Sequence, residues 1–345
     1  MPACEGKNTM TVNKEKLLGF VLHGISKARI LVIGDVMLDR YYYGEVSRIS
    51  PEAPVPINHV LRVVDTMGGS ANVAHNLALL GCKTYIAGFV GNDYHCQTLM
   101  DKFTSRGIDF KGIIHRDAPT TTKLRVIGGH QQMLRLDFED TEPVGEQYAD
   151  RLVNFVEQKL QHGLDAVIIS DYGKGACTEA VCTSIIQACR DMAVPVFVDP
   201  KGVEWEKYAG ADYITPNFKE LNAVQTRPIR NRDEQIEQAA QFVIDKYDIR
   251  NVLATRSEYG MSLVQPEEGI VHIPTKAQEV FDVSGAGDTV ISVFALGIAG
   301  GLKPVEAAYL ANLAASVVVA KVGTYAVSNA ELQEALLEKE EALSN

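Results

Sequence analysis

The chain has 345 residues, of which 46% are hydrophobic and 22% charged, a balance typical of a soluble globular protein with one large α/β domain or two smaller ones. Its formal net charge of -11 argues against nucleic acid or an acidic membrane surface as a main partner. No apolar run reaches the roughly 18 residues that a membrane-spanning helix needs. No signal-peptide pattern opens the chain, and the six cysteines lack metal-site or disulfide spacing, so we expect a cytoplasmic protein with reduced thiols.

The first quarter of the chain predicts a buried strand with a polar edge. Residues 1–28 are expected to form a tail and a short amphipathic helix. The stretch 29–33, apolar after Arg29 and closed by Gly34 and Asp35, is typical of a central strand buried on both faces. Ligands of open α/β sheets bind beyond the carboxyl ends of such strands. Asp39 follows that end and could accept hydrogen bonds from sugar hydroxyls, although a loop or capping role explains it equally well.

Two later segments have a β-rich character instead, residues 40–66 and about 112–138. Their apolar residues alternate with polar ones, as in half-exposed strands. We expect them to form a small β lid over the carboxyl edge of the main sheet. Because exposed strand edges are commonly covered, a homodimer through this lid is expected. Arg125, on the second segment, could meet a phosphate or could be a solvated strand charge.

Regular alternation of strand and helix fills the rest of the chain. Gly69 and Asn72 open a helix, where glycine permits close backbone approach and the amide offers both a donor and an acceptor to a polyol. The βα rhythm from 145 to 255 predicts a doubly wound, mostly parallel sheet. After this region we expect a pair of strands at about 261–273 and then three helices that extend to about residue 340.

Residues 217–220 begin one of these helices with Asn at the N-cap and Glu three positions later. This is the pattern of a capping box. The same carboxylate, Glu220, could also hold a hydrated magnesium ion beside a nucleotide. Both roles can coexist.

The most informative stretch is 280–291, which we interpret as a strand end, a Gly-Ala-Gly turn and the start of a buried helix. Free N–H groups at such a helix start favour anions. Asp288 would repel a phosphate there, but it is suited to take a proton from an attacking hydroxyl. The function indicated is phosphoryl transfer, with Asp288 as base and the amides of Gly285, Ala286 and Gly287 as a cradle. The alternative is an ordinary glycine turn with a capping Asp.

Several of these stretches resemble the ribokinase-like (PfkB) carbohydrate kinases over roughly 29–335. Residues 68–74 and 282–289 resemble that family's two signatures, and 217–220 resemble its Asn-x-x-Glu element. The resemblance implies a three-layer α/β/α fold with a small β lid, a kinase domain over 29–340, and ATP and Mg²⁺ as cofactors. Some members also bind K⁺ near the positions of Asp282 and Ser284.

A closer resemblance is to the heptose 7-phosphate kinases of ADP-heptose synthesis, carried by residues 34–41, 47–56, 122–125, 131–139 and 255–263. It implies phosphorylation of D-glycero-β-D-manno-heptose 7-phosphate at the anomeric hydroxyl, giving the 1,7-bisphosphate for lipopolysaccharide core assembly. Another sugar or nucleoside kinase of this fold, or a non-catalytic sugar-binding regulator, are the alternatives. Some relatives carry a nucleotidyltransferase domain with a His-x-Gly-His motif; this sequence lacks the motif, so we expect a stand-alone kinase.

The resemblance also implies a distribution of roles around the catalytic Asp288. The residues expected to bind the nucleotide are Asn217, Phe218, Lys219, Glu220, Arg256, Ser257 and Gly260, with Glu220 also holding Mg²⁺. The residues expected to hold sugar hydroxyls are Asp39, Gly69 and Asn72. The candidates for the substrate's own phosphate are Arg48, Lys174, Lys201 and Arg125.

Overall fold

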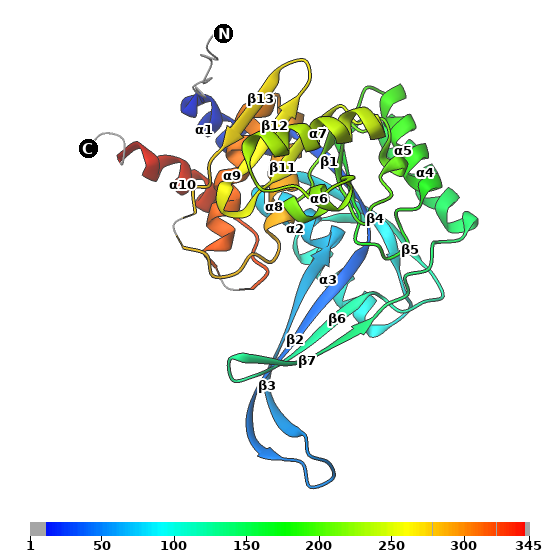
Figure 1. Cartoon of the computed structure of the whole chain (residues 1–345). Helices are drawn as coiled ribbons and strands as arrows, with labels where there is room; N and C mark the ends of the chain where they lie inside the picture. The colour runs from blue at the N-terminus through cyan, green and yellow to red at the C-terminus, as the bar shows by residue number, and fades with distance from the viewer. Residues whose placement is uncertain (1–11, 278, 322, 342–345) are drawn as a thin grey trace.

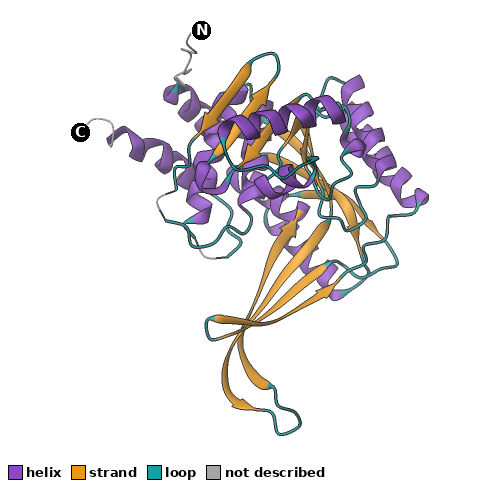
Figure 2. Cartoon of the chain, in the orientation of Figure 1, coloured by secondary structure: helices purple, strands orange, loops and turns teal. Residues whose placement is uncertain are grey.

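The computed structural model describes residues 12–277, 279–321 and 323–341, and its centre is a nine-stranded sheet (Figure 1 and Figure 2). The strand order is β13-β12-β11-β10-β9-β8-β1-β4-β5. Neighbouring strands are parallel except for the antiparallel pairs β11–β12 and β12–β13. The strands are β1 (Arg29–Gly34), β4 (Lys83–Val90), β5 (Asp109–His115), β8 (Ala166–Ser170), β9 (Val196–Asp199), β10 (Tyr213–Ile214), β11 (Asn251–Thr255), β12 (Met261–Gln265) and β13 (Gly269–Ile273).

Helices cover both faces of this sheet, as the side chains of β1 demonstrate. Ile30 and Val32 belong to one buried core cluster, and Leu31 and Ile33 belong to the other, because successive side chains of a strand point to opposite faces. The helices of the first cluster are α1 (Lys14–His23), α2 (Ser70–Leu80), α3 (Tyr94–Ser105), α8 (Ala286–Ala299), α9 (Pro304–Val319) and α10 (Asn329–Glu341). The helices of the second are α4 (Glu146–Gln161), α5 (Glu179–Asp191), α6 (Phe218–Ala223) and α7 (Asp233–Tyr247). The predicted three-layer, doubly wound fold is confirmed.

A four-stranded sheet extends away from the body of the molecule (Figure 1). Its order is β3-β2-β6-β7, with β2 spanning Val36–Ile49, β3 Pro56–Gly69, β6 Thr122–Gly128 and β7 Gln131–Phe138. β6 runs beside β2 only as far as Gly44, and beyond that point β2 pairs with β3 alone. One expected boundary is wrong: residues 112–115 belong to β5, which pairs with β4 in the large sheet. We call β2, β3, β6 and β7 the small sheet.

The chain reverses its direction of winding next to β1. β4 and β5 are added on one side of β1, whereas β8, β9, β10 and β11 are added on the other. Such a switch point leaves a crevice at the carboxyl ends of the strands, where ligands of open α/β sheets bind. Asp35 follows β1 and Asp171 follows β8, so both acids lie at this crevice.

The segment before α8 is a loop and not the strand end that its apolar residues predicted. Val280, Phe281 and Val283 are 61%, 64% and 67% exposed, so no sheet surface covers them. The loop is held by backbone contacts instead: the N–H of Phe281 donates to the carbonyl of Val319, and Asp282 accepts from the N–H of Ser284 at 2.9 Å. β-Branched and aromatic residues favour strands only where a pleated, half-buried surface exists to receive them.

Across the described ranges, the structure contains no helix with both the length and the apolar content needed to cross a membrane. α1 lies within the N-terminal segment for which a short helix was expected, and it packs through Leu17 and Val21 onto the first core cluster.

Candidate active site

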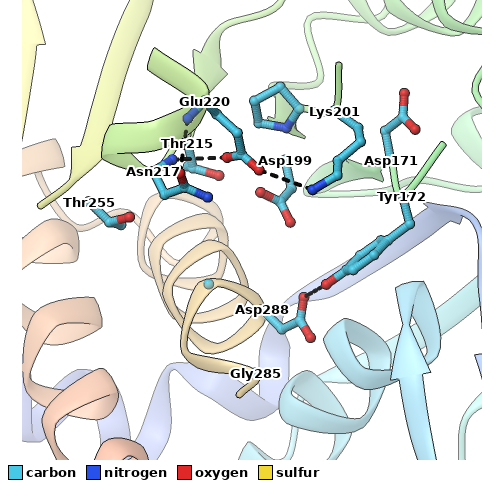
Figure 3. Close-up of a pocket in the computed structure, with 12 residues that line it drawn as sticks. Asp171, Tyr172, Asp199, Lys201, Thr215, Asn217, Glu220, Thr255, Gly285 and Asp288 are labelled. Atoms are coloured by element: carbon cyan, nitrogen blue, oxygen red, sulfur yellow. Dashed lines mark hydrogen bonds and ion pairs between the residues drawn. The ribbon is translucent and has the colours of Figure 1, made fainter. Parts of the chain in front are cut away.

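A hollow of about 220 Å³ lies at the carboxyl ends of β8, β9 and β10, facing the start of α8 (Figure 3). Figure 3 shows Asp199 and Glu220 on one side of it, and Asp288 with Tyr172 on the other. Its lining residues are Asp171, Tyr172, Asp199, Pro200, Lys201, Thr215, Asn217, Glu220, Thr255, Gly285, Gly287 and Asp288.

The start of α8 positions Asp288 at the bottom of this hollow. Gly285 has φ +81°, in the left-handed region, and a Cβ atom there would lie 3.0 Å from the side-chain nitrogen of Asn72, so glycine is required for both conformation and space. Asp288 is only 5% exposed. Its Oδ1 accepts a hydrogen bond from the Tyr172 hydroxyl, and its Oδ2 accepts one from Asn72 Nδ2, each at 2.6 Å.

Burial raises the pKa of Asp288 from 3.8 to about 6, although the hydrogen bonds from Tyr172 and Asn72 act to lower it. A carboxylate with a pKa just below neutrality is mostly ionised at pH 7 and is a much stronger base than an ordinary surface Asp. This is the condition that favours general-base catalysis.

The amides beside Asp288 form a smaller cradle than expected. The N–H of Ala286 donates to the carbonyl of Val283 at 3.2 Å, so it is engaged within the turn. Among the described residues, the N–H groups of Gly285 and Gly287 have no acceptor, and both glycines line the hollow. The cradle therefore consists of these glycine amides, and Ala286 supports the turn.

Asp199 was missed by the sequence interpretation, although it follows the carboxyl end of β9. Burial and the negative charges of Asp288 and Glu220 raise its pKa well above the usual value. Its carboxylate receives no hydrogen bond from any residue in the described ranges. An Asp-Pro pair closing a predicted strand was the available signal. A cation would relieve this repulsion, so Asp199 and Glu220 fit a magnesium ion by their donor chemistry.

The capping box at α6 is present. Asn217 Oδ1 accepts from the N–H groups of Lys219 and Glu220 at 2.9 and 3.0 Å, and Glu220 Oε2 accepts from the N–H of Asn217 at 3.0 Å. Glu220 Oε1 lies 3.4 Å from Lys201 Nζ, which places Lys201 on the Glu220 side of the hollow and not with the sugar residues. Phe218 packs against the second core cluster and Lys219 is exposed, so neither lines the hollow.

The Arg256 side chain, expected to bind the nucleotide, does not line the hollow. Its side chain is 2% exposed and donates to Asn231 Oδ1, Asp233 Oδ1 and Ser262 Oγ at 2.8, 2.6 and 3.0 Å. These bonds hold the buried guanidinium between β12, which carries Ser262, and the start of α7, which carries Asp233. Ser257 and Gly260 belong to the turn between those strands, and Thr255 is the residue of this region that lines the hollow.

The residues expected to bind the sugar converge on Asp288 from the small sheet and α2. Arg125 Nη1 pairs with Asp39 Oδ1 at 2.5 Å, and the Asp39 charge acts to raise the pKa of Asp288. Gly69, at the start of α2, has φ +55°, and a Cβ there would lie 2.5 Å from the carbonyl oxygen of Asp35. Glycine is therefore needed for α2 to begin at this point and deliver Asn72.

The remaining candidates for the substrate's phosphate separate from one another. Lys174 Nζ pairs with Glu139 at 2.9 Å. Arg48 is exposed on the far part of β2, nine residues beyond Asp39, which at about 3.3 Å per residue is roughly 30 Å away along the strand. Within one chain Arg48 therefore lies outside the site. Lys123 replaces it as a candidate, because its ammonium lies 5.6 Å from the ring centroid of Tyr172.

A sequence model of the pfkB family carbohydrate kinases matches residues 27–331, nearly the whole chain. The chain belongs to the pfkB family of carbohydrate kinases. It is therefore a sugar kinase, an enzyme that transfers a phosphoryl group to a sugar hydroxyl, and the hollow around Asp288 is the candidate active site of this kinase.

Curated relatives in this family share nearly half of the sequence. The chain is 45% identical over 312 residues to the bifunctional protein HldE of Photobacterium profundum, covering 90% of this chain and 64% of that protein. It is 43% identical over 318 residues to the bifunctional protein HldE of Trichlorobacter lovleyi, and the match covers 92% of this chain and 64% of that protein. The chain thus spans just under two thirds of the length of these relatives.

Solved structures of sugar kinases share the fold of the chain. Arabidopsis thaliana ribokinase complexed with ribose and ATP superposes with a TM-score of 0.70 at 20% identity, covering 90% of this chain and 99% of that one. Phosphofructokinase-2 from Escherichia coli in complex with substrates and products has a TM-score of 0.73 at 19% identity, and the match covers 92% of this chain and 100% of that one. These similarities establish the ribokinase-like fold.

Proposed function

We propose that this kinase phosphorylates D-glycero-β-D-manno-heptose 7-phosphate at its anomeric hydroxyl, with ATP as donor, to give the 1,7-bisphosphate for ADP-heptose synthesis. The observation that carries the chemistry is the buried Asp288, whose pKa of about 6 suits a base. The heptose substrate is supported by the resemblance of residues 34–41, 47–56 and 131–139 to heptose 7-phosphate kinases, and by 43–45% identity to HldE proteins. We place the reaction in the cytoplasm, because ATP is the donor.

In the proposed mechanism, the sugar hydroxyl gives its proton to Asp288 as its oxygen attacks the terminal phosphorus of ATP. The free N–H groups of Gly285 and Gly287 stabilise the charge on the transferring group, and one such preorganised donor typically contributes about 2.7–4 kcal/mol. Asp199 and Glu220 would hold Mg²⁺, which neutralises phosphate charge when bound. Lys201, on the same side as Glu220, would contact the nucleotide phosphates.

A monovalent-cation site beside Asp282 remains part of the proposal. A neighbouring structure, Escherichia coli phosphofructokinase-2, has been solved in complex with potassium. In this chain the Asp282 carboxylate accepts from the N–H groups of Ser284 and Gly323 at 2.9 and 3.1 Å. It therefore joins the turn before α8 to the segment after α9, where a bound cation would stiffen the start of α8.

The 7-phosphate would lie against the cations of β6. Arg125 is paired with Asp39 and Lys174 with Glu139, whereas Lys123 has no carboxylate within ion-pair distance among the described residues. Burial lowers the pKa of the Lys123 ammonium. The Asp39 charge acts to raise this pKa, whereas the positive charges of Arg135, Lys174 and Arg125 lower it further. A phosphate dianion would reverse that penalty, and this makes Lys123 the leading candidate.

The substrate assignment is tested with a panel of sugars, each supplied with and without its terminal phosphate. We expect kcat/KM for heptose 7-phosphate to exceed that for the unphosphorylated heptose by about tenfold to a hundredfold, the value of one or two charge-assisted hydrogen bonds. Preference for an unphosphorylated sugar or for a nucleoside would instead identify another pfkB kinase. ATP consumption that does not depend on any sugar would contradict both.

We also propose that the small sheet mediates a homodimer. Ten large apolar side chains on the small sheet and its β2–β3 loop are 40–63% exposed, and such a surface is commonly buried in an interface. They are Val46, Ile49, Val55, Val60, Leu61, Val63, Met133, Leu134, Leu136 and Phe138. Sedimentation should show a dimer that Leu61→Glu weakens, whereas Leu22→Glu, at an exposed position of α1, leaves it intact. A monomeric wild-type protein would contradict this proposal.

A further inference from the structure

The turn between β8 and α5, residues 171–176, is held more rigidly than a surface loop. The Asp35 carboxylate accepts hydrogen bonds from three of its backbone N–H groups, those of Tyr172 at 2.7 Å, Lys174 at 3.0 Å and Ala176 at 3.1 Å. Asp35 itself is 3% exposed. The buried carboxylate of Asp35 therefore holds the backbone of residues 172–176 in one conformation.

A second buried acid fixes the beginning of the same turn. Asp171 accepts from the N–H of Gly173 at 2.7 Å, from Lys207 Nζ at 2.5 Å and from the hydroxyl of Tyr208 at 2.7 Å. Because both ends of the Tyr172 backbone are held, its side chain has a defined direction. That direction brings the phenolic oxygen to 2.6 Å from Asp288, 116 residues away in sequence.

The charged and polar groups around Asp288 come from five elements besides its own helix. Asn72 on α2 and Tyr172 after β8 donate to its two oxygens. Asp39 on β2 and Asp199 on β9 are negative, and Lys123 on β6 is positive. Of these, Tyr172 is the largest influence that opposes the effect of burial on the pKa of Asp288.

We propose that Tyr172 is the positioning residue of the catalytic base: its hydroxyl keeps Asp288 in the charged form and fixes the carboxylate so that its remaining lone pairs face the sugar hydroxyl. The proposal rests on the proposed role of Asp288. Burial and the neighbouring charge of Asp288 raise the pKa of Tyr172 well above its usual value, so Tyr172 remains a donor throughout the working pH range. The proton that Asp288 gains comes from the substrate, and Tyr172 keeps its own.

Tyr172→Phe removes one oxygen and leaves the ring, which Lys123 covers at 5.6 Å. Loss of a hydrogen bond to the charged form should move the acid limb of the kcat/KM profile upward by about one pH unit. Starting from a pKa of about 6, the activity of the variant relative to the wild type should be about threefold lower at pH 6.5 than at pH 8.5, where the carboxylate is ionised in both proteins. The KM for ATP should not change.

Tyr208→Phe is the matched control, because Tyr208 supports Asp171 in the same turn without contacting Asp288. We expect its acid limb to coincide with that of the wild type. Carboxyl ¹³C titration of labelled aspartate, with Asp288→Asn identifying the resonance, measures the same shift without turnover. An unmoved limb and resonance in Tyr172→Phe would overturn the proposal, and equal shifts in both variants would assign the effect to turn rigidity and overturn it too. Near-normal turnover of Asp288→Asn would overturn the base assignment itself.

Discussion

Replacing Asp288 with Asn should raise the stability of the protein while nearly abolishing its activity. The carboxylate is 5% exposed and its pKa is raised from 3.8 to about 6 by burial. Because the folded state binds the proton more tightly than the unfolded state does, ionised Asp288 destabilises the fold. The destabilisation develops as pH rises from about 4 to about 6 and is complete above that range.

The difference between 3.8 and about 6 corresponds to about 3 kcal/mol at neutral pH. The introduced amide can still accept from Asn72 and can donate to the Tyr172 oxygen, since a phenol both donates and accepts. It loses the charge-assisted strength of these bonds, so we expect a net gain of about 1–3 kcal/mol in the free energy of unfolding at pH 7.5. At pH 4 the gain should vanish. Turnover should fall by about two to four orders of magnitude, the usual contribution of a general base.

Two measurements on the same preparations check this reasoning. Urea denaturation at pH 7.5 and pH 4 compares the free energies of unfolding, and a coupled assay for ADP release compares turnover. The reasoning would be refuted by a variant that is less stable than the wild type at pH 7.5, or by turnover within tenfold of the wild type.

Three further substitutions probe the hollow, the small sheet and the turn after β11. Glu220→Gln keeps an acceptor for the capping bond but removes the charge, so the Mg²⁺ concentration for half-maximal activity should rise about tenfold or more, as a metal titration of initial rates would reveal. Lys123→Met should raise the KM for the phosphorylated sugar by about tenfold to a hundredfold, and steady-state kinetics should give an unchanged KM for ATP. Arg256→Met should lower the free energy of unfolding, measured by urea titration, by about 1–3 kcal/mol. The KM for ATP should stay constant, and a large rise in that KM would show that Arg256 does bind the nucleotide.

Local signals in the sequence were sufficient for the central strand and for the capping box. The continuous apolar run that became β1 has no polar face because both of its faces are covered, and a strand of that kind occurs almost only in parallel sheets. The spacing of Asn217 and Glu220 specified the capping box because its bonds join residues three positions apart. Each of these features depends on neighbours within a few residues, so sequence order alone carries the information.

The surroundings of the site depend instead on contacts between distant segments. Tyr172 contacts Asp288, which is 116 residues away in the sequence. No local sequence pattern predicts a contact between residues so far apart. Asp39 and Arg125 become partners through the pairing of β2 with β6, so two residues assigned to different parts of the substrate neutralise each other. Arg256 follows a strand at the correct edge, but its side chain turns back toward Asn231 and Asp233. Direction of a side chain at a strand end is set by tertiary partners that the motif does not contain.

The arrangement of charge around the hollow also constrains how a nucleotide can enter it. Asp199, Glu220 and Asp288 contribute carboxylates to one small space, and among its lining residues Lys201 is the only cation. A triphosphate without a metal would add further negative charge to a site where burial and the neighbouring negative charges already raise the pKa of Asp199. A divalent cation held by Asp199 and Glu220 would supply positive charge that offsets the repulsion between these carboxylates and the phosphates. We therefore expect the same carboxylates that lower the stability of the empty site to select the metal-bound nucleotide over the free one.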